Sequence, residues 1–249
     1  MTALLEVTAI SKRFGGVQAV HDLSFAVQEG EILGLIGPNG AGKSTVFNLI
    51  NGVHPPDQGR IVFQGQDITG KPPHRVARYG LARAHQIVQP LTGMTVLENC
   101  TVGACFGREN LPLGRAREVV REAADMVGLS DRLDHLAGRL TTAGKKRLEL
   151  ARALSARPKL LLLDEVLAGL NPTEIELMIS VIRRIRASGI AILMIEHVMR
   201  VIMSLSDRIV VLNLGTKLAE GTPQAVANDR EVIAAYLGEP EPSAPNAGA

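Results

Sequence analysis

The feature that most constrains the fold of this 249-residue chain is a glycine-rich segment, GPNGAGKST, at residues 37–45. It fits the pattern GxxxxGK[ST], follows the apolar run at residues 32–36, and leads into a segment expected to be helical from Lys43. A strand, a glycine-rich turn and a helix in this order form a loop whose N–H groups surround phosphate oxygens beside the positive end of the helix dipole. An ordinary glycine-rich turn would need neither neighbour, so a phosphate-binding loop is favoured.

The residues of this loop have distinct expected roles. Lys43 is expected to reach the β- and γ-phosphates and to act in catalysis, and the Ser44 hydroxyl is expected to bind Mg²⁺. Eight residues of the loop are predicted to contact the nucleotide: Gly37, Asn39, Gly40, Ala41, Gly42, Lys43, Ser44 and Thr45.

Polar residues follow two other apolar runs. Asp164 and Glu165 come directly after residues 160–163, where Asp164 suits the Mg²⁺ shell and Glu165 suits a base that orients the attacking water. The alternative is a buried strand that ends in two solvated acids. His197 follows the run at residues 191–195, so parallel strands would bring it to the same sheet edge, where it could contact the γ-phosphate. A histidine at a strand end is also often purely structural.

Apolar runs alternate with helical patterns along the chain, which predicts an α/β fold with a mixed, mainly parallel sheet. The early strands are separated by glycine turns, as in an antiparallel subdomain. Strands are expected at residues 4–10, 23–27, 32–36, 60–63, 160–163, 191–195 and 209–212, and helices are expected at residues 172–187 and from Val198. Between residues 88 and 140 the strand signal disappears, and residues 115–127 carry a helical pattern, which predicts an inserted helical subdomain that extends to about residue 156. One domain is expected over residues 1–238, with a disordered tail at residues 239–249.

Composition excludes several classes of protein. No apolar run approaches the roughly 18–20 residues that cross a bilayer, and the first residues do not resemble a secretory signal, so a cytosolic chain is expected. Net charge is +2 and aromatic residues make up 3% with no Trp, which disfavours nucleic acid as a partner. Cys100 and Cys105 lack the partners of a zinc site and are expected to be reduced thiols.

Taken together, these motifs resemble the ATP-binding subunits of ABC transporters, with P-loop NTPase cores, over nearly the whole chain from Leu5 to Glu239. The resemblance implies that Phe14 stacks on adenine, and that Gln86 contacts the metal and senses a membrane partner. It also implies that His197 is a switch histidine in catalysis. ATP and Mg²⁺ are the implied cofactors, and no NKxD segment typical of GTPases is present.

The signature segment of that family, LSGGQ, departs here to LTTAGK at residues 140–145. Without gaps Thr141 takes the serine place, and a slip of one residue aligns Thr142 instead, so both registers stay open. The candidates for contact with the ATP of a second subunit are Thr141, Thr142, Ala143 and Gly144. Lys145, Lys146 and Arg147 are expected on a solvated basic face.

Finer segments, among them LAGLNP after the two acids and VIAAYLGE near the C-terminus, are similar to ATPases of branched-chain or hydrophobic amino acid importers. This resemblance implies two transmembrane permeases, a second identical or paralogous ATPase subunit, an indirect link to a periplasmic solute-binding protein, and a peripheral place on the cytoplasmic face of the membrane. The alternatives are the ATPase of a lipid exporter and a soluble ABC-type ATPase. The transported molecule is not readable from the sequence of such a subunit.

Overall fold

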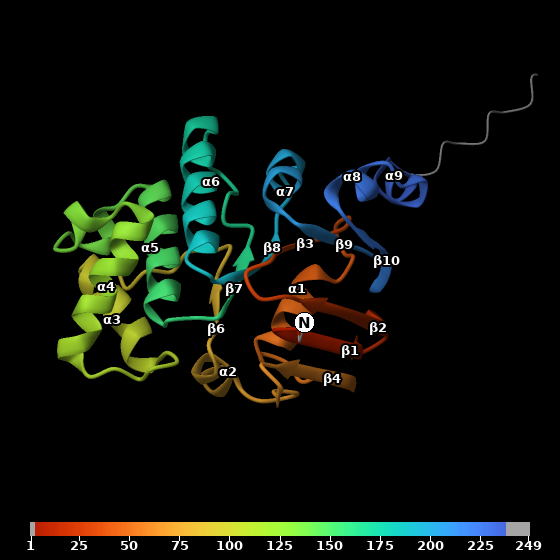
Figure 1. The fold of residues 1–249 in the computed structure, drawn as a ribbon, viewed down its shortest axis with the longest axis horizontal. Helices are drawn as coiled ribbons and strands as arrows, with labels where there is room; N and C mark the ends of the chain where they lie inside the picture. Colours follow the sequence, from red (N-terminus) through yellow and green to blue (C-terminus); the bar gives the residue numbers. More distant parts are fainter. Residues whose placement is uncertain (1–2, 238–249) are drawn as a thin grey trace, which may run out of the picture.

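The computed structural model describes residues 3–237, which form two β-sheets and the helices that cover them (Figure 1). The larger sheet has the strand order β10-β9-β3-β8-β7-β6, and all neighbours are parallel except β9 and β10. Its strands are β3 (Ile32–Ile36), β6 (Leu81–Ala84), β7 (Leu160–Asp164), β8 (Ala191–Ile195), β9 (Arg208–Asn213) and β10 (Thr216–Gly221). This confirms the predicted mixed, mainly parallel sheet.

The smaller sheet is antiparallel, with the order β2-β1-β4-β5. Its strands are β1 (Leu5–Phe14), β2 (Val17–Val27), β4 (Gln58–Phe63) and β5 (Gln66–Asp67). Helix α1 (Lys43–Ile50) lies between the two sheets. Its Phe47 belongs to the same buried cluster as Phe25 of β2 and Leu35 of β3. The antiparallel part of the predicted fold is therefore confirmed, and its first two strands are longer than predicted.

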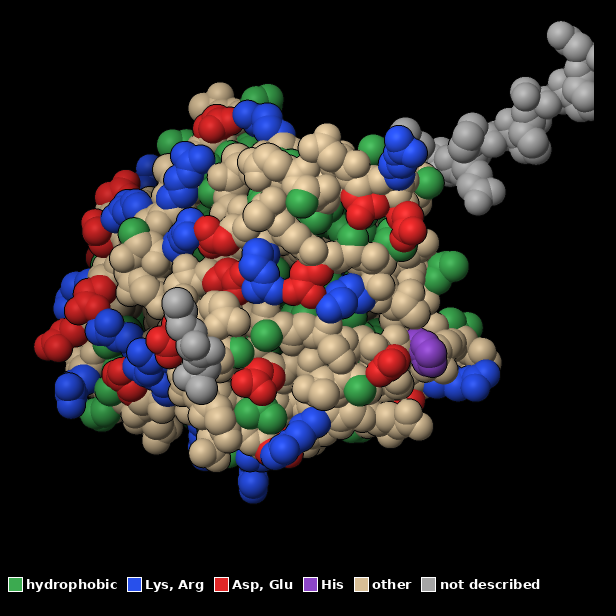
Figure 2. Space-filling view, turned by 45° about the vertical axis from the view of Figure 1, so that its right-hand side comes forward, with side chains coloured by type: hydrophobic (Ala, Val, Ile, Leu, Met, Phe, Trp, Pro, Cys, Tyr) green, Lys and Arg blue, Asp and Glu red, His purple; other side chains and the backbone are tan. Residues whose placement is uncertain are grey.

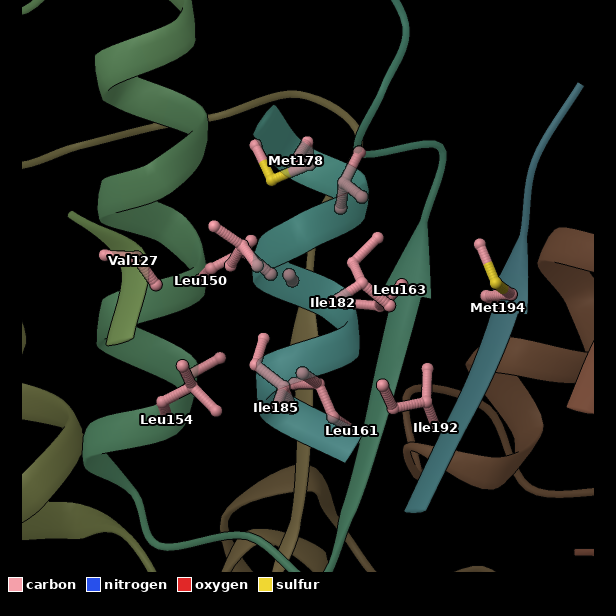
Figure 3. Close-up of a cluster of buried hydrophobic side chains, with 14 of the residues drawn as sticks. Val127, Leu150, Leu154, Leu161, Leu163, Met178, Ile182, Ile185, Ile192 and Met194 are labelled. Carbon is pink, nitrogen blue, oxygen red and sulfur yellow. The ribbon is translucent and has the colours of Figure 1, made fainter. Parts of the chain in front are cut away.

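The central strands are continuous apolar runs because helices cover them. Every residue of β3, β7 and β8 is buried, as expected for parallel strands with both faces covered. Helix α6 (Pro172–Ala187) packs on one face between these strands and α5 (Thr142–Ser155), and Figure 3 shows its buried side chains. The contacting residues labelled there are Met178, Ile182 and Ile185 of α6, Leu161, Leu163, Ile192 and Met194 of the strands, and Leu150 and Leu154 of α5.

Helices replace strands in the segment after residue 88. Helices α3 (Val96–Phe106) and α4 (Leu113–Val127) pack on each other and on α5, and two 3₁₀ turns, Ser130–Arg132 and Ala137–Arg139, connect α4 to α5. Helix α4 contains the helical pattern predicted at residues 115–127. This helical group lies at one end of the larger sheet, beyond α6 (Figure 1).

Several short elements were not predicted. Helix α7 (Met199–Leu205) begins one residue after its predicted start. The strands β5, β6 and β10 and the helices α2 (Pro73–Tyr79), α8 (Pro223–Ala227) and α9 (Arg230–Leu237) are too short to show a clear periodic pattern in the sequence. The tail at residues 239–249 and the domain end predicted at residue 238 lie outside the described residues. Across residues 3–237, none of the helices combines the length and hydropathy that a membrane span requires.

The surface carries charges of both signs. Figure 2 shows one face on which Lys and Arg side chains lie among Asp and Glu side chains, with hydrophobic side chains in small groups between them. Neither sign dominates this face, in keeping with the formal net charge of +2.

A glycine sets the spacing between α3 and α5. A Cβ atom at Gly103 would come within 2.2 Å of the Arg152 carbonyl oxygen. Gly103→Ala should therefore force the two helices apart and lower the free energy of unfolding by about 1–3 kcal/mol, the usual cost of overpacking. Urea denaturation measures the difference. Gly114→Ala is the matched control, because Gly114 in α4 has open space around this position, and equal stability of the two variants would contradict the close contact.

Candidate functional site

Two glycines allow the phosphate loop to lie directly against neighbouring strands. Gly37 has φ +152°, and a Cβ atom added to it would lie 2.2 Å from the carbonyl oxygen of Leu212. Gly42 has φ +100°, and a Cβ atom added to it would lie 2.4 Å from the carbonyl oxygen of Ala19. Any other residue at either position would have to displace backbone atoms. The glycines of the motif are therefore required both by the loop conformation and by its support from β9 and β2.

Lys43 is folded into the loop. Its Nζ donates to the carbonyl oxygens of Gly37 at 2.7 Å and Pro38 at 3.0 Å. Burial lowers the pKa of Lys43, while the negative charge of Glu165 acts in the opposite direction. Asn39, Gly40 and Ser44 are exposed at the rim of the loop, Gly42 and Thr45 are half-buried, and Ala41 is buried.

Glu165 is the point at which three of the predicted residues meet. Its carboxylate contacts Nε2 of His197 at 2.7 Å through one oxygen and accepts a hydrogen bond from Nε2 of Gln86 through the other. Glu165 has φ +49°, an uncommon conformation for a residue with a side chain, and its N–H donates to the Ile195 carbonyl at 2.9 Å. Strain of this kind is concentrated at functional sites.

Asp164 contacts an arginine that the sequence reasoning did not assign. Nη2 of Arg83 lies 2.5 Å from Oδ2 of Asp164, and both side chains are only 8% exposed. Nη1 of the same guanidinium donates to Oδ1 of Asn48 in α1 at 2.7 Å. No signal in the sequence pointed to this contact, because the short β6 strand that carries Arg83 was not predicted.

Behind Glu165 lies a buried carboxyl group. Glu196 is 3% exposed and accepts a hydrogen bond from the N–H of Leu167 at 2.9 Å. Burial raises the pKa of Glu196 to about 7, although the Leu167 N–H acts in the opposite direction.

Lys146 is also buried, so its predicted place on a solvated basic face is wrong. Helix α5 turns this residue inward, and burial lowers the pKa of Lys146 against the opposing charges of Glu196 and Glu165.

The donor set at this edge of the sheet fits a magnesium ion that is held mainly by phosphates. Ser44, Asp164 and Gln86 offer a hydroxyl, a carboxylate and an amide oxygen, the hard donors that Mg²⁺ prefers. Within residues 3–237 no three His, Cys, Asp or Glu side chains come together as a metal cluster. Mg²⁺ usually uses one or two carboxylates together with substrate phosphates and water, which matches this arrangement. The Gln86 amide nitrogen contacts Glu165, and a metal contact by its oxygen stays a prediction.

The segment that departs from the family signature starts a helix. Thr141 is the N-cap of α5, and its hydroxyl accepts a hydrogen bond from the N–H of Gly144 at 3.1 Å. Since the first N–H groups of a helix have no acceptor within it, those of Thr142 and Ala143 remain available for an anion at this end of α5. Thr141 and Thr142 are exposed.

Asn171 is the N-cap of α6, a position for which Asn and Asp are equally suitable.

Phe14 lies at the end of β1 and is 43% exposed. The ring of His54 meets it edge-on, with centroids 5.3 Å apart at 73°, and Nζ of Lys12 lies 5.6 Å from the Phe14 centroid. The contact with His54 was not predicted. One face of an exposed aromatic ring suits stacking on a base, which stays a prediction for Phe14.

A glycine-rich loop between a strand and a helix, two adjacent acids at the end of a neighbouring strand, and a helical group beside a mixed sheet are together typical of an ATP-binding cassette. The chain belongs to the ABC transporter ATP-binding family. A family model described as "ABC transporter" matches residues 20–168, and one described as "Branched-chain amino acid ATP-binding cassette transporter" matches residues 216–242. The predicted family, the P-loop fold class and the ATPase class are thereby confirmed.

Among curated proteins, the high-affinity branched-chain amino acid transport ATP-binding protein BraF of Pseudomonas aeruginosa is 40% identical over 250 residues, covering 95% of this chain and 98% of that protein. LivG of Escherichia coli K12, with the same description, is also 40% identical with the same coverage. The crystal structure of the ADP conformation of an ATP-binding cassette of an ABC transporter has a TM-score of 0.87 and 34% identity, covering 96% of this chain and all of that chain. A nucleotide-free cassette has a TM-score of 0.86 and 33% identity with the same coverage.

Glu196 should make stability depend on pH. At a pH between the ordinary glutamate pKa and about 7, Glu196 is protonated in the folded protein but ionised in the unfolded chain. The free energy of unfolding is therefore highest at acidic pH and falls as the pH rises through about 7. Glu196→Gln stays neutral and keeps an acceptor for Leu167. Thermal unfolding at pH 5 to 8 should show the variant gaining on the parent by up to about 3 kcal/mol. Glu118→Gln on the surface of α4 should follow the parent, and parallel curves for Glu196→Gln and the parent would contradict the burial effect.

Proposed function

We propose that this chain is the ATP-hydrolysing subunit of an ABC importer that takes up branched-chain or other hydrophobic amino acids, or related small molecules. The observation that carries this proposal is the meeting of Gln86 and His197 on Glu165, in a chain whose C-terminal part matches the branched-chain amino acid cassette family. BraF and LivG, described above as transport ATP-binding proteins for branched-chain amino acids, support the substrate class.

In this proposal the loop N–H groups and Lys43 hold the phosphates of ATP. Lys43 exchanges its contacts with the Gly37 and Pro38 carbonyls for the β- and γ-phosphate oxygens. Ser44 and Asp164, with Gln86, would hold Mg²⁺, which supplies positive charge to the transferring phosphoryl group. The exposed ring of Phe14 stacks on adenine.

Hydrolysis needs a water molecule oriented towards the γ-phosphate. Glu165 would accept a proton of this water while the water oxygen bonds to the γ-phosphorus and the bond from that phosphorus to the bridging oxygen of ADP breaks. His197 holds the Glu165 carboxylate through its Nε2 and, in this proposal, also contacts the γ-phosphate. Gln86 donates to the other carboxylate oxygen and so helps to orient Glu165. Positioning and charge stabilisation account for most of the catalysis of phosphoryl transfer.

A second ATPase subunit, identical or paralogous, completes each site. Thr141, Thr142, Ala143 and Gly144 at the start of α5 would contact the γ-phosphate bound by the partner subunit, through hydroxyl groups and the free N–H groups described above. The helix dipole favours an anion at this end. Binding of ATP then closes two subunits, and hydrolysis reopens them.

The membrane partners have a suitable docking surface beside Gln86. A groove of about 390 Å³ lies between α2, α3, α5 and β6. Phe106 in α3 is 69% exposed and Val102 is 37% exposed, so the α3 wall of the groove is apolar, while His85, Glu149 and Arg152 line its inner side. In this proposal the cytoplasmic segments of two transmembrane permeases occupy such grooves, and the chain lies at the cytoplasmic face of the membrane. A periplasmic solute-binding protein would act through those permeases.

Lipid export is the second candidate function. The lipopolysaccharide export system ATP-binding protein LptB of Haemophilus influenzae is 35% identical over 237 residues, covering 95% of this chain and 98% of that protein. The 40% identity to BraF and the C-terminal family match favour import of amino acids.

Glu165→Gln tests the proposed catalytic role. Turnover of ATP should fall by about 100-fold or more, because the amide cannot take a proton from water, while binding of Mg²⁺-ATP persists. Phosphate release and equilibrium nucleotide binding measure the two effects.

In cells the same variant should abolish uptake of labelled leucine. Glu176→Gln on exposed α6 is the control. Retained hydrolysis would remove Glu165 from the role, and unchanged uptake with impaired lipid export would favour the second function.

Phe106→Asp tests the docking groove. A charge in the apolar wall should prevent co-purification of the chain with its co-expressed permeases, since burial of an unpaired carboxylate is unfavourable. Leu177→Asp is the control, because Leu177 is 59% exposed on α6 outside the groove. If both variants co-purify equally with the permeases, the groove is not the docking surface.

A further inference from the structure

Arg83 connects the two elements that carry the proposed magnesium ligands. Its guanidinium contacts Asp164 at the end of β7 at 2.5 Å and Asn48 in α1 at 2.7 Å. Asn48 and Ser44 are four residues apart in α1, so they lie on the same face of the helix. A single buried side chain therefore joins the Asp164 carboxylate to the helix face that presents the Ser44 hydroxyl.

The chemistry of arginine suits this position. A guanidinium is planar and permanently charged, and its separate N–H donors can hold two acceptors in a fixed relation, which the point charge of lysine cannot do. The ring of Phe47 lies under it, with Cζ of Arg83 5.6 Å from the ring centroid. The bond to Oδ2 fixes one oxygen of Asp164 and leaves Oδ1 for another partner.

The same arginine is not optimal for stability. Its Nε is buried and has no hydrogen-bond partner among the described residues, and a buried donor without an acceptor costs free energy. An apolar side chain of similar volume would often be as stable as a buried ion pair. A requirement other than stability therefore accounts for the charge at this position.

We propose that Arg83 is a positioning residue that sets the relation between Asp164 and Ser44 and thereby strengthens binding of Mg²⁺ with the nucleotide. The inference rests on the proposed function, because it takes Asp164 and Ser44 as the metal ligands. Arg83 touches neither phosphate nor metal in this scheme and acts through the Asp164 carboxylate. Residues that orient metal ligands in this way typically change metal affinity by about 10- to 100-fold.

The test measures binding rather than turnover. In the full-length Glu165→Gln chain, which holds ATP without hydrolysing it, the dissociation constant of a fluorescent ATP analogue is determined with Mg²⁺ and with EDTA. Arg83→Met should reduce the gain in affinity from Mg²⁺ by about 10-fold or more and leave the affinity in EDTA unchanged, because the loop N–H groups and Lys43 remain. Arg60→Met, which removes an exposed ion pair with Asp67 on the smaller sheet, should change neither value.

A double-mutant cycle separates this role from a general structural one. When Asp164→Asn is already present, Arg83→Met should cause no further loss, since the residue acts through Asp164. An additive loss, or an equal loss with Mg²⁺ and with EDTA, overturns the inference. If Asp164→Asn alone leaves the Mg²⁺ effect intact, the metal assignment in the proposed function fails first, and the inference fails with it.

Two milder variants keep the test decisive if Arg83→Met does not fold. Arg83→Lys retains the charge but cannot hold the two acceptors in a fixed relation, and Asn48→Leu removes the second acceptor and leaves the ion pair. Both should fold with melting temperatures near that of the parent and should lose part of the Mg²⁺ effect. Full retention of the effect in both variants overturns the proposal.

Discussion

The parallel pairing of β3, β8 and β7 is the constraint on which the rest of the site depends. These strands are adjacent in the sheet, and Asp164 is in register with Ile195. Because all three run in the same direction, their carboxyl ends deliver the phosphate loop, the two acids and His197 to one edge. Residues that are far apart in the chain thus meet without any long loop having to fold back. The buried backbone of these strands makes the edge rigid.

Around this edge, charges of both signs are held at low exposure. Glu165, Asp164 and Glu196 supply three carboxyl groups, and Lys43 and Lys146 supply ammonium groups whose pKa values burial lowers. Such an arrangement is costly in the absence of a ligand and favourable when phosphates and a divalent cation add their own charges. This arrangement of charges suits an anionic substrate that brings a divalent cation with it, as the proposed function requires.

The parts of the fold that could be predicted are those with strong local signals. The bounds of β3, α6 and β8 agree with prediction because their apolar runs are unbroken and Asn171-Pro172 marks the start of a helix. The loop glycines were recognised by pattern and are explained by backbone contacts that only the structure reveals. Their partners, the carbonyls of Leu212 and Ala19, come from strands that no pattern connects to the loop.

The parts that could not be predicted concern polar side chains inside the molecule. Lys146 and Glu196 look like surface residues, because their burial depends on how α5 packs against the sheet edge. Arg83 stands in a four-residue strand whose pattern gives no signal of its own. The N-cap role of Thr141 reflects hydrogen bonds at one helix end, and the departure from the family signature hid it.

The close approach of α3 to α5 at Gly103 has a mechanical consequence. Arg152, whose carbonyl faces Gly103, also holds Glu149 at 2.5 Å and donates to the Gln89 carbonyl at 3.4 Å. Backbone in contact with backbone is stiff, so a displacement of α3 cannot be absorbed by side-chain rotation at that crossing. A displacement of α3 would therefore move α5 with it, and the hydrogen bond from Arg152 to the Gln89 carbonyl links that movement to the segment that follows Gln86.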